Sequence, residues 1–395
     1  MQLLKYLNMN TLKIFFLGFL LLNINLVSIS QAEENIISGE QVLVKLSDTN
    51  EDSIFKLLSD INDSNADPTQ YRQYLSKFND IALYKDYSDM TRGIAILVIG
   101  KVGLPDPKAV DYLLNIANTP ASFFIQREVI NSLSFWLTAQ RNISVLSRMR
   151  NKYKFTYQKH DWVEAFLPTI KKQLSSEDKW VRKAAITTLG DAGSYAVNSV
   201  NQLLYLYKDL FQIDEGLRKE ISRSINKIAD DLHMRVENQN LDIETRKQAI
   251  SDISKLDLII FAHLMVDTNQ SMQSFLYEMP KTDLYLSRSI QKWPEPELTI
   301  HTMKTLQDTI QITNKQHMSV TRKPRYSKSF TIDLEFIKPI SSRLFDENPD
   351  VQISAIKLLA TLGKASERAI PTLEKLRKKH PSLENDISEA IKAIK

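Results

Sequence analysis

Apolar side chains recur along most of the chain at the three- and four-residue spacing of a helix with one buried face. In the segment that begins at Asp178, the apolar positions Val181, Ala185 and Leu189 form such a stripe, and Gly193 follows it. Aspartate is a common N-capping residue, and glycine is common just past a helix end. Few segments alternate apolar and polar residues at every second position, so the pattern predicts an all-α protein.

The same arrangement recurs six times, and each copy begins with a residue type that caps helices. These capping positions are Ser88, Ser122, Asp178, Asp214, Asp242 and Asn348. Three residues later stand Thr91, Ile125, Val181, Leu217, Thr245 and Val351. The next apolar positions are Ala95, Val129, Ala185, Ile221, Ala249 and Ala355, and then Ile99, Leu133, Leu189, Ile225, Ile253 and Leu359. This agreement predicts one structural unit that the chain repeats.

Each repeated helix has a partner helix before it. Ile170 and Leu174 precede Val181 at the same distances at which Ile340 and Leu344 precede Val351. The unit is therefore a helical hairpin. Because neither helix can bury its apolar stripe alone, we expect neighbouring hairpins to stack into a solenoid.

The repeats are unevenly spaced, with 34, 56, 36, 28 and 106 residues between successive capping positions. The interval of 56 leaves room for an extra helix around residues 142–155. The interval of 106 is expected to hold two or three degenerate hairpins and an insertion, with helices at 257–265, 271–291 and 296–316. The stretch 317–330 has no apolar period and five basic residues, which predicts a surface loop. Before the first repeat, residues 37–85 are expected to add two or three capping helices.

The Asp-x-x-Val-Arg sequence that begins at Asp178 resembles the HEAT/armadillo repeat family. Asp214 and Asp242 begin two echoes of it, and the resemblance spans roughly residues 67–395 with gaps. It implies an α-solenoid (superhelix) of HEAT-like helical hairpins. In that family this Asp and Arg tend to form a ladder between repeats, which implies a structural role for Arg182, Arg218 and Arg246. Such solenoids host many roles, so the resemblance does not define a function.

The first residues have the features of a secretory signal peptide. Lys5 and Lys13 precede or flank an apolar run, and Ser30 and Ala32 place small residues where a signal peptidase cleaves. Cleavage after Ala32 would leave no stable membrane span and direct the protein to the bacterial periplasm or the medium; an uncleaved anchor is the alternative. We therefore divide the chain into a signal peptide (1–32), an N-terminal tail with capping helices (33–87), HEAT-like repeats (88–270), degenerate helices with a basic loop insertion (271–331) and a C-terminal HEAT-like repeat with its cap (332–395).

Composition and motifs argue against most catalytic chemistries. The chain has no Cys, so it lacks disulfides and thiolate sites, and its 51 Lys and Arg nearly balance its 47 Asp and Glu. It has no glycine-rich phosphate loop, no nucleophile elbow and no His-Glu-x-x-His motif. Asp230 and His233 share a helix face, but two ligands do not make a metal site. We expect no enzyme activity, no cofactor and no metal. The four tryptophans are expected to pack repeats together; they are Trp136, Trp162, Trp180 and Trp293.

Positive charge gathers at the positions of the repeated helix that point away from the apolar stripe. These positions lie two, six and ten residues after the Val181 position, and across six repeats nine of them are basic and one is acidic. The densest part comprises Lys183, Lys219, Arg223, Lys227, Lys247 and Lys255. We expect the side chains of Lys219, Arg223 and Lys227 to be solvated. In HEAT-like solenoids the second helix of each hairpin lines the concave surface, so the resemblance implies a basic groove. The alternative is that acids on neighbouring helices neutralise it.

These observations predict an exported, non-catalytic scaffold that binds a partner on the basic concave face, with Arg322 and Arg325 of the 317–330 loop as a second candidate surface. We expect a protein partner with an anionic surface. The alternative is a HEAT-like enzyme or a nucleic-acid-binding protein, although the signal peptide argues against nucleic acid. The oligomeric state stays open.

Overall fold

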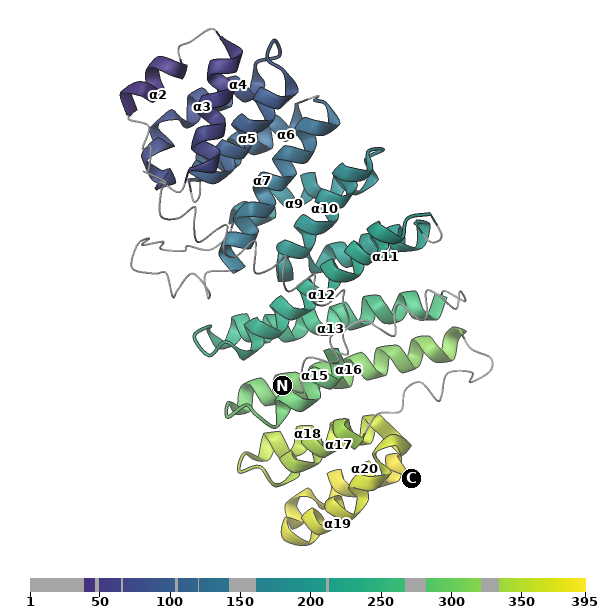
Figure 1. The fold of residues 1–395 in the computed structure, drawn as a ribbon. Helices are drawn as coiled ribbons and strands as arrows, with labels where there is room; N and C mark the ends of the chain where they lie inside the picture. The colour runs from purple at the N-terminus through teal and green to yellow at the C-terminus, as the bar shows by residue number, and fades with distance from the viewer. Residues whose placement is uncertain are drawn as a thin grey trace, which may run out of the picture. The chain divides into compact units, whose positions relative to one another are not determined.

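A computed structural model describes the chain as an all-helical protein (Figure 1). The residues it describes are 39–46, 50–64, 67–103, 106–119, 121–141, 161–210, 213–266, 282–320 and 334–395. Among these residues every regular element is an α-helix or a short 3-10 turn. The chain forms two compact units, 1–132 and 133–395, which are described separately.

In the first unit, the helices pack around α5 (Asp89–Gly103). Its neighbours are α3 (Glu51–Asp63), α4 (Leu75–Leu83) and α6 (Pro107–Asn118). A short helix α2 (Gly39–Leu46) contacts α3, so the prediction of two or three helices before the first repeat is confirmed. Ile96 and Ile99 of α5 are fully buried. The boundary between the two units falls inside the next helix, α7 (Phe123–Arg141).

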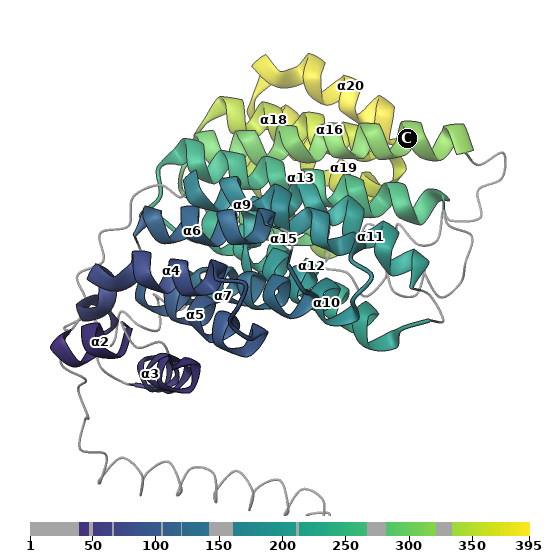
Figure 2. The same cartoon turned by 90° about the horizontal axis from the view of Figure 1, so that it is seen from above.

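The second unit is built from helices in two layers. One layer, which we call the main layer, comprises α10 (Lys179–Asp191), α12 (Glu215–Glu237), α13 (Ile243–Val266), α16 (Pro296–Val320), α18 (Pro349–Leu362) and α20 (Glu384–Ile394). Each of these helices packs on the next one, and Figure 2 shows α13, α16, α18 and α20 side by side. The other layer, the backing layer, comprises α9 (Asp161–Lys172), α11 (Val200–Asp209), α15 (Thr282–Ile290), α17 (Leu334–Ser342) and α19 (Ile370–Lys379). This is the helical-hairpin solenoid that the repeat predicted.

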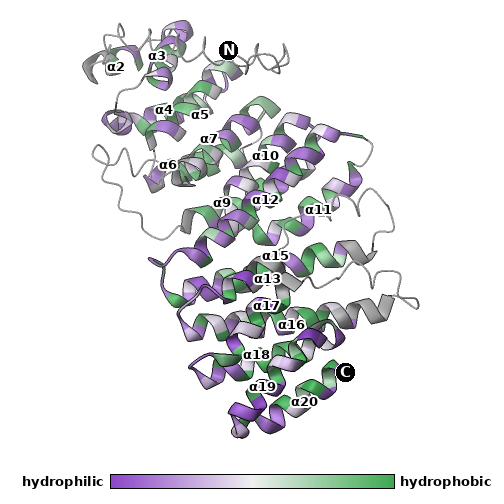
Figure 3. Ribbon diagram, turned by 60° about the horizontal axis from the view of Figure 1, so that its bottom comes forward, coloured by the Kyte–Doolittle hydropathy of each residue, from purple (hydrophilic) through white to green (hydrophobic). Residues whose placement is uncertain are grey.

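The predicted helix starts are confirmed at all six capping positions. Each capping side chain accepts a hydrogen bond from the backbone amide three residues later, at 2.8–3.4 Å. Ala95, Ala185 and Ala355, the small residues of the apolar stripe, are fully buried. Gly193 lies just past α10 with φ of 59°, a conformation that favours glycine. In Figure 3 the helices carry both green and purple residues, as expected of helices with one buried side.

The direction of the main-layer helices reverses once, between α12 and α13. Helices α10 and α12 are parallel, because ion pairs join the start of one to the start of the other and the end of α10 to the later part of α12. Helix α13 runs back along α12, since Arg246 near the start of α13 donates to the backbone carbonyl of Val236 at the end of α12. Helices α13 and α16 are again parallel, because Lys247 pairs with Glu297 and Ser251 contacts His301.

This reversal corrects the expectation that Asp242 begins the second helix of an ordinary hairpin. Asp242 does cap α13, but only 28 residues separate it from Asp214. Helix α12 occupies 23 of those residues. The short connection at 238–242 leaves no room for a backing helix, so the chain turns directly into the next main-layer helix.

Other expectations are changed in detail. The helix predicted at 257–265 is the second half of α13, and the helix predicted at 296–316 is confirmed as α16. Helix α16 continues to Val320, so the first part of the predicted 317–330 loop is helical. The rest of that loop, with Arg322 and Arg325, lies outside the described residues. So do the predicted signal peptide and the helix expected around 142–155.

None of the helices that the structure describes combines the length and the apolar character needed to cross a membrane.

Candidate functional site

Four of the predicted basic residues lie on two neighbouring helices. Partners on α10 and α12 are separated by 33 to 36 residues in sequence, as in the contacts of Thr187 with Glu220 and of Asp191 with Lys227. Lys183 and Lys219 are equivalent positions of the two neighbouring repeats, and so are Thr187 and Arg223. We call the surface formed by Lys183, Thr187, Lys219, Arg223 and Lys227 the α10–α12 face.

Acidic partners lie underneath the outermost cations of this face. Lys227 forms an ion pair of 2.7 Å with Asp191, whose side chain is 8% exposed against 39% for the lysine. Arg223 pairs with Glu220 at 3.2 Å, and here the exposed fractions are 10% for the acid and 69% for the arginine. The ion pairs are neutral as a whole, but each of them presents its positive end to solvent.

Further hydrogen bonds hold the buried carboxylates in place. Asp191 also accepts a hydrogen bond of 2.6 Å from the hydroxyl of Ser134, and Glu220 accepts one of 3.1 Å from Thr187. A carboxylate that accepts hydrogen bonds from several donors is fixed in one orientation, and it keeps the cation that pairs with it in position. The acids therefore stabilise the outward position of the cations.

Two more ion pairs lie where the α10–α12 face meets the starts of the two helices. Lys179 on α10 pairs with Asp214, the capping residue of α12, at 2.8 Å. This ammonium group and the Leu217 amide lower the pKa of Asp214. Lys219 pairs with Glu215 at 2.6 Å, and its hydrogen bond lowers the pKa of Glu215. Both members of the second pair are exposed, so this pair can open to a competing ligand at little cost.

The remaining predicted residues of the groove lie beyond the reversal, on α13. Lys247 lies between Glu244 at 2.8 Å and Glu297 at 3.5 Å, and the hydrogen bond that the lysine donates to Glu244 raises its pKa. The lysine is 22% exposed and Glu244 is 79% exposed, so the negative end faces solvent here. Lys255 donates to the side-chain carbonyl of Asn198, in the 3-10 turn after α10. The structure thus groups four of the six predicted cations and places two in other surroundings.

Tryptophan 180 was expected to pack repeats together, and for this residue the expectation is wrong. Trp136 is 1% exposed and Trp293 is also buried, which confirms it for those two, but Trp180 is 57% exposed. The ammonium group of Lys183 lies 5.7 Å from the centre of the Trp180 ring. The sequence contained a signal for this, because Trp180 is three residues before Lys183 and therefore shares its outward helix face. The side chain of Trp162 lies outside the described residues.

The arginines that follow three of the repeat's apolar positions contact neighbouring parts of the repeat. Arg182 donates to the backbone carbonyls of Ser176 and Glu177, which precede its own helix, at 2.6 and 3.0 Å. Arg246 donates to the last turn of α12 and pairs with Glu295 at 2.8 Å. The Arg218 guanidinium lies 5.6 Å from the ring centre of Tyr207, on the preceding helix. These contacts fit the structural role implied for the three arginines.

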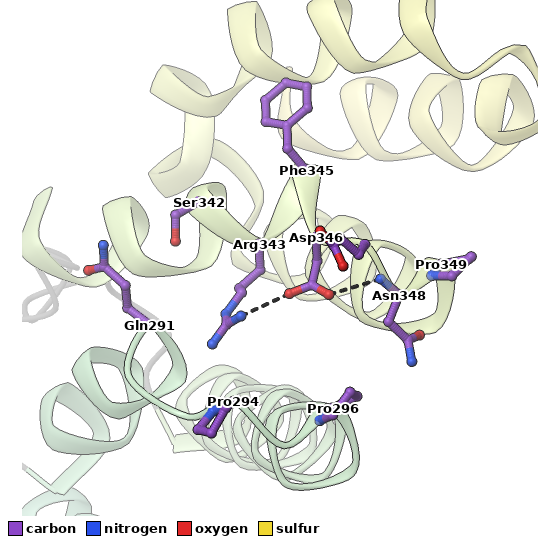
Figure 4. A pocket seen from close by; sticks show the side chains of 10 residues that line it. Gln291, Pro294, Pro296, Ser342, Arg343, Phe345, Asp346, Asn348 and Pro349 are labelled. Atoms are coloured by element: carbon purple, nitrogen blue, oxygen red, sulfur yellow. Dashed lines mark hydrogen bonds and ion pairs between the residues drawn. The ribbon is translucent and has the colours of Figure 1, made fainter.

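A hollow of about 730 Å³ lies between the loops that precede α16 and α18 (Figure 4). Arg343 extends into it, and it donates to the backbone carbonyls of Ile290 and Trp293 and to the carboxylate of Asp346 at 2.6–2.8 Å. Asp346 in turn accepts from the Asn348 amide. These groups hold the end of α15 and the start of α18 together.

His233, which was considered as a metal ligand, is a partly buried residue of α12. Burial lowers the pKa of His233, and the nearby carboxylates of Asp230 and Glu237 only partly oppose this. Within the part of the chain that the structure describes, no three side chains of the ligating types come together to hold a metal ion.

No family model matches the chain, and no curated protein matches it either. Among solved structures, an engineered protein shares 14% identity at a TM-score of 0.39, over 90% of this chain and 98% of that chain. Kap121p shares 11% identity at a TM-score of 0.38, over 92% of this chain and 40% of that chain. A computationally designed armadillo repeat protein for modular peptide recognition shares 16% identity at a TM-score of 0.26, over 58% of this chain and 100% of that chain.

Proposed function

We propose that this protein is an exported, non-catalytic scaffold that binds an acidic segment of a partner protein on the α10–α12 face. One observation carries the proposal: Asp191 and Glu220 are buried beneath Lys227 and Arg223, so that neutral pairs present cations to solvent. A surface of this kind attracts carboxylates although its total charge is small.

The ion pairs also explain how several cations can stand together. Lys183 and Lys219 occupy equivalent positions on neighbouring helices, where two unpaired cations would repel each other. The carboxylates beneath and beside the face offset this repulsion in the free protein. A partner carboxylate can then accept hydrogen bonds from the outward ammonium and guanidinium groups, which are of the strong, charge-assisted kind.

The test changes Lys183 and Lys219, because the buried acids Glu220 and Asp191 pair with the other two cations of the face. We expect the double variant Lys183→Glu, Lys219→Glu to fold normally, because both side chains are exposed. It should capture the partner at least about ten-fold less well when proteins are cross-linked in the native cell envelope and co-purified, and capture by the unchanged protein should weaken as salt rises. The control Lys304→Glu, Lys357→Glu changes the net charge equally on α16 and α18. Equal capture by both double variants would refute the proposed surface.

The export part of the proposal has its own measurement. N-terminal sequencing of the protein from a cell-envelope fraction should begin after Ala32. An intact Met1 on a membrane-bound product would contradict the periplasmic location and leave the binding surface to be judged separately.

A further inference from the structure

We infer that Trp180 is the apolar anchor of the α10–α12 face, and that the acidic segment carries one large apolar side chain that packs against it. This inference rests on the proposed function, which it makes more specific. It assigns the surface a partner class: an extended peptide in which acidic residues flank an aromatic or aliphatic one.

The first observation is that the indole of Trp180 is exposed to solvent, although tryptophan is a residue that usually packs into a core. A tryptophan has a large apolar area, and packing between repeats is where this chain places Trp136 and Trp293. Trp180 instead stands in the first turn of α10 and is 57% exposed. Solvent contact of this area is unfavourable, and a ligand side chain that covers it would regain that free energy.

A second exposed apolar residue stands beside the same helix starts. Ile213 directly precedes Asp214, and it is among the most exposed large apolar residues of the described chain. Asp214 is bonded to Lys179, which directly precedes Trp180. The two apolar side chains therefore flank one ion pair, at the start of two parallel helices.

The third observation is a glycine at the position of α12 that corresponds to Trp180 on α10. Each of the two residues lies two positions after the capping residue of its helix, Asp178 for Trp180 and Asp214 for Gly216. A Cβ atom at Gly216 would meet only the Asp214 carboxylate, at 3.3 Å. The backbone there has no positive φ that would require glycine. Gly216 is exposed, so the start of α12 carries no side chain at the position where α10 carries the indole.

The positive charges beside Trp180 indicate which kind of ligand would bind there. The ammonium group of Lys183 lies 5.7 Å from the indole centre, and Lys219 occupies the equivalent place on α12. Carboxylates on either side of an inserted apolar residue would meet these cations. An acidic peptide fits this combination, whereas a purely apolar partner would leave the cations without a counter-charge. Aromatic anchors between charged groups are the usual centres of binding energy in such interfaces.

The experiment measures peptide binding to the full mature chain by tryptophan fluorescence and by calorimetry. The probe is acetyl-Glu-Asp-Glu-Asp-Phe-Asp-Glu-Asp-Glu-amide, and its matched control has Ser in place of Phe. We expect the Phe peptide to bind at least about ten-fold more tightly. Trp180→Ala should abolish this preference and leave the salt dependence of both peptides unchanged, whereas Trp180→Phe should retain it. The control Tyr205→Ala removes an equally exposed aromatic ring from α11 and should have no effect.

Gly216→Leu gives an independent test that keeps the indole. Its side chain would stand at the exposed start of α12, at the position that corresponds to Trp180 on α10, and the preference for the Phe peptide should fall while the Ser peptide binds as before. A preference that survives both Trp180→Ala and Gly216→Leu would overturn the anchor but not the proposed function. If Lys183→Glu, Lys219→Glu binds both peptides normally, or if neither peptide binds the unchanged protein, the proposed function and the anchor both fail. Binding to anionic phosphatidylglycerol vesicles without any peptide preference would equally overturn the inference.

Discussion

The α10–α12 pair and the α13–α16 pair are both pairs of parallel helices in the same unit, and they present opposite charges. In the first pair the carboxylates of Asp191 and Glu220 are buried and their cations face solvent. In the second pair Lys247 is the less exposed member, and Glu244 and Glu297 are the more exposed ones. The direction of packing therefore does not explain the difference.

The difference follows from where the acids stand along the helices. Glu244 and Glu297 lie in the first turns of α13 and α16, where carboxylates interact favourably with the helix dipole and stay in solvent. Asp191 lies at the last residue of α10, and Glu220 lies in the second turn of α12, both at the contact between the helices. The comparison shows that outward charge in a helical repeat depends on the depth of each ion-pair member, and that the number of lysines per face is a poor guide to it.

The largest expected effect comes from the close contact between α10 and α12. A Cβ atom at Gly190 would lie 2.7 Å from the Cα of Ser224, so Gly190→Ala should force the two helices apart. We expect a loss of about 3 kcal/mol in the free energy of unfolding, measured by urea denaturation. Gly216→Ala is the control, because a Cβ there would approach only the Asp214 carboxylate, at 3.3 Å, and no backbone atom of another helix; it should cost much less. Equal stability of the two variants would mean that the helices do not approach each other as described.

A second change tests whether the burial of the acid in an ion pair affects the stability of the protein. Lys227→Met removes the cation that pairs with Asp191. The buried carboxylate then keeps the hydrogen bond from the Ser134 hydroxyl but loses this ion pair. Because the lysine is partly exposed, we expect a loss of about 2 kcal/mol, below the range for fully buried pairs. Lys247→Met in the other pair leaves exposed acids and should cost less than about 0.5 kcal/mol. Thermal unfolding of both variants gives the comparison, and equal losses would contradict the difference in depth. The structure also corrects the expectation that Lys227 is simply solvated.

A third change addresses the small position of the stripe. Ala185 is fully buried in α10, so Ala185→Leu should overpack the hairpin and cost about 1–3 kcal/mol. Ala262 on α13 is exposed, and Ala262→Leu serves as its control. A melting temperature that Ala185→Leu leaves unchanged would show that this side chain does not face the core.

The sequence predicted the local structure well because the local signals are strong. A capping side chain such as Asp178 begins every repeat, and four of the six repeats have an alanine at a fixed distance from it; both were found where expected. The reversal at α12 and α13 was not predicted, although the short interval before Asp242 contained the information. The burial of Asp191 beneath Lys227 could not be predicted, because it depends on which residue of the neighbouring helix is opposite. Local spacing defines a helix face, whereas charge orientation is a property of two helices together.

The smallest expected effect is a dependence of stability on pH in the α13–α16 pair. The His301 ring contacts the Ser251 hydroxyl and the backbone carbonyl of Lys247, each at 3.1 Å. Burial lowers its pKa below the ordinary value; the Lys247 carbonyl and Glu244 act in the opposite direction, and the charges of Lys247 and Lys304 add to the lowering. A histidine whose pKa is lower in the folded state contributes its full stability above the unfolded pKa, near 6.5, and loses it as the pH falls through the folded value. The melting temperature should therefore decrease over this window, and His301→Gln, which keeps a donor for the carbonyl, should reduce the decrease. His233 on α12 has its pKa lowered in the same direction, so it should account for part of the remaining slope. A slope that is identical with and without His301 would place the titrating group elsewhere.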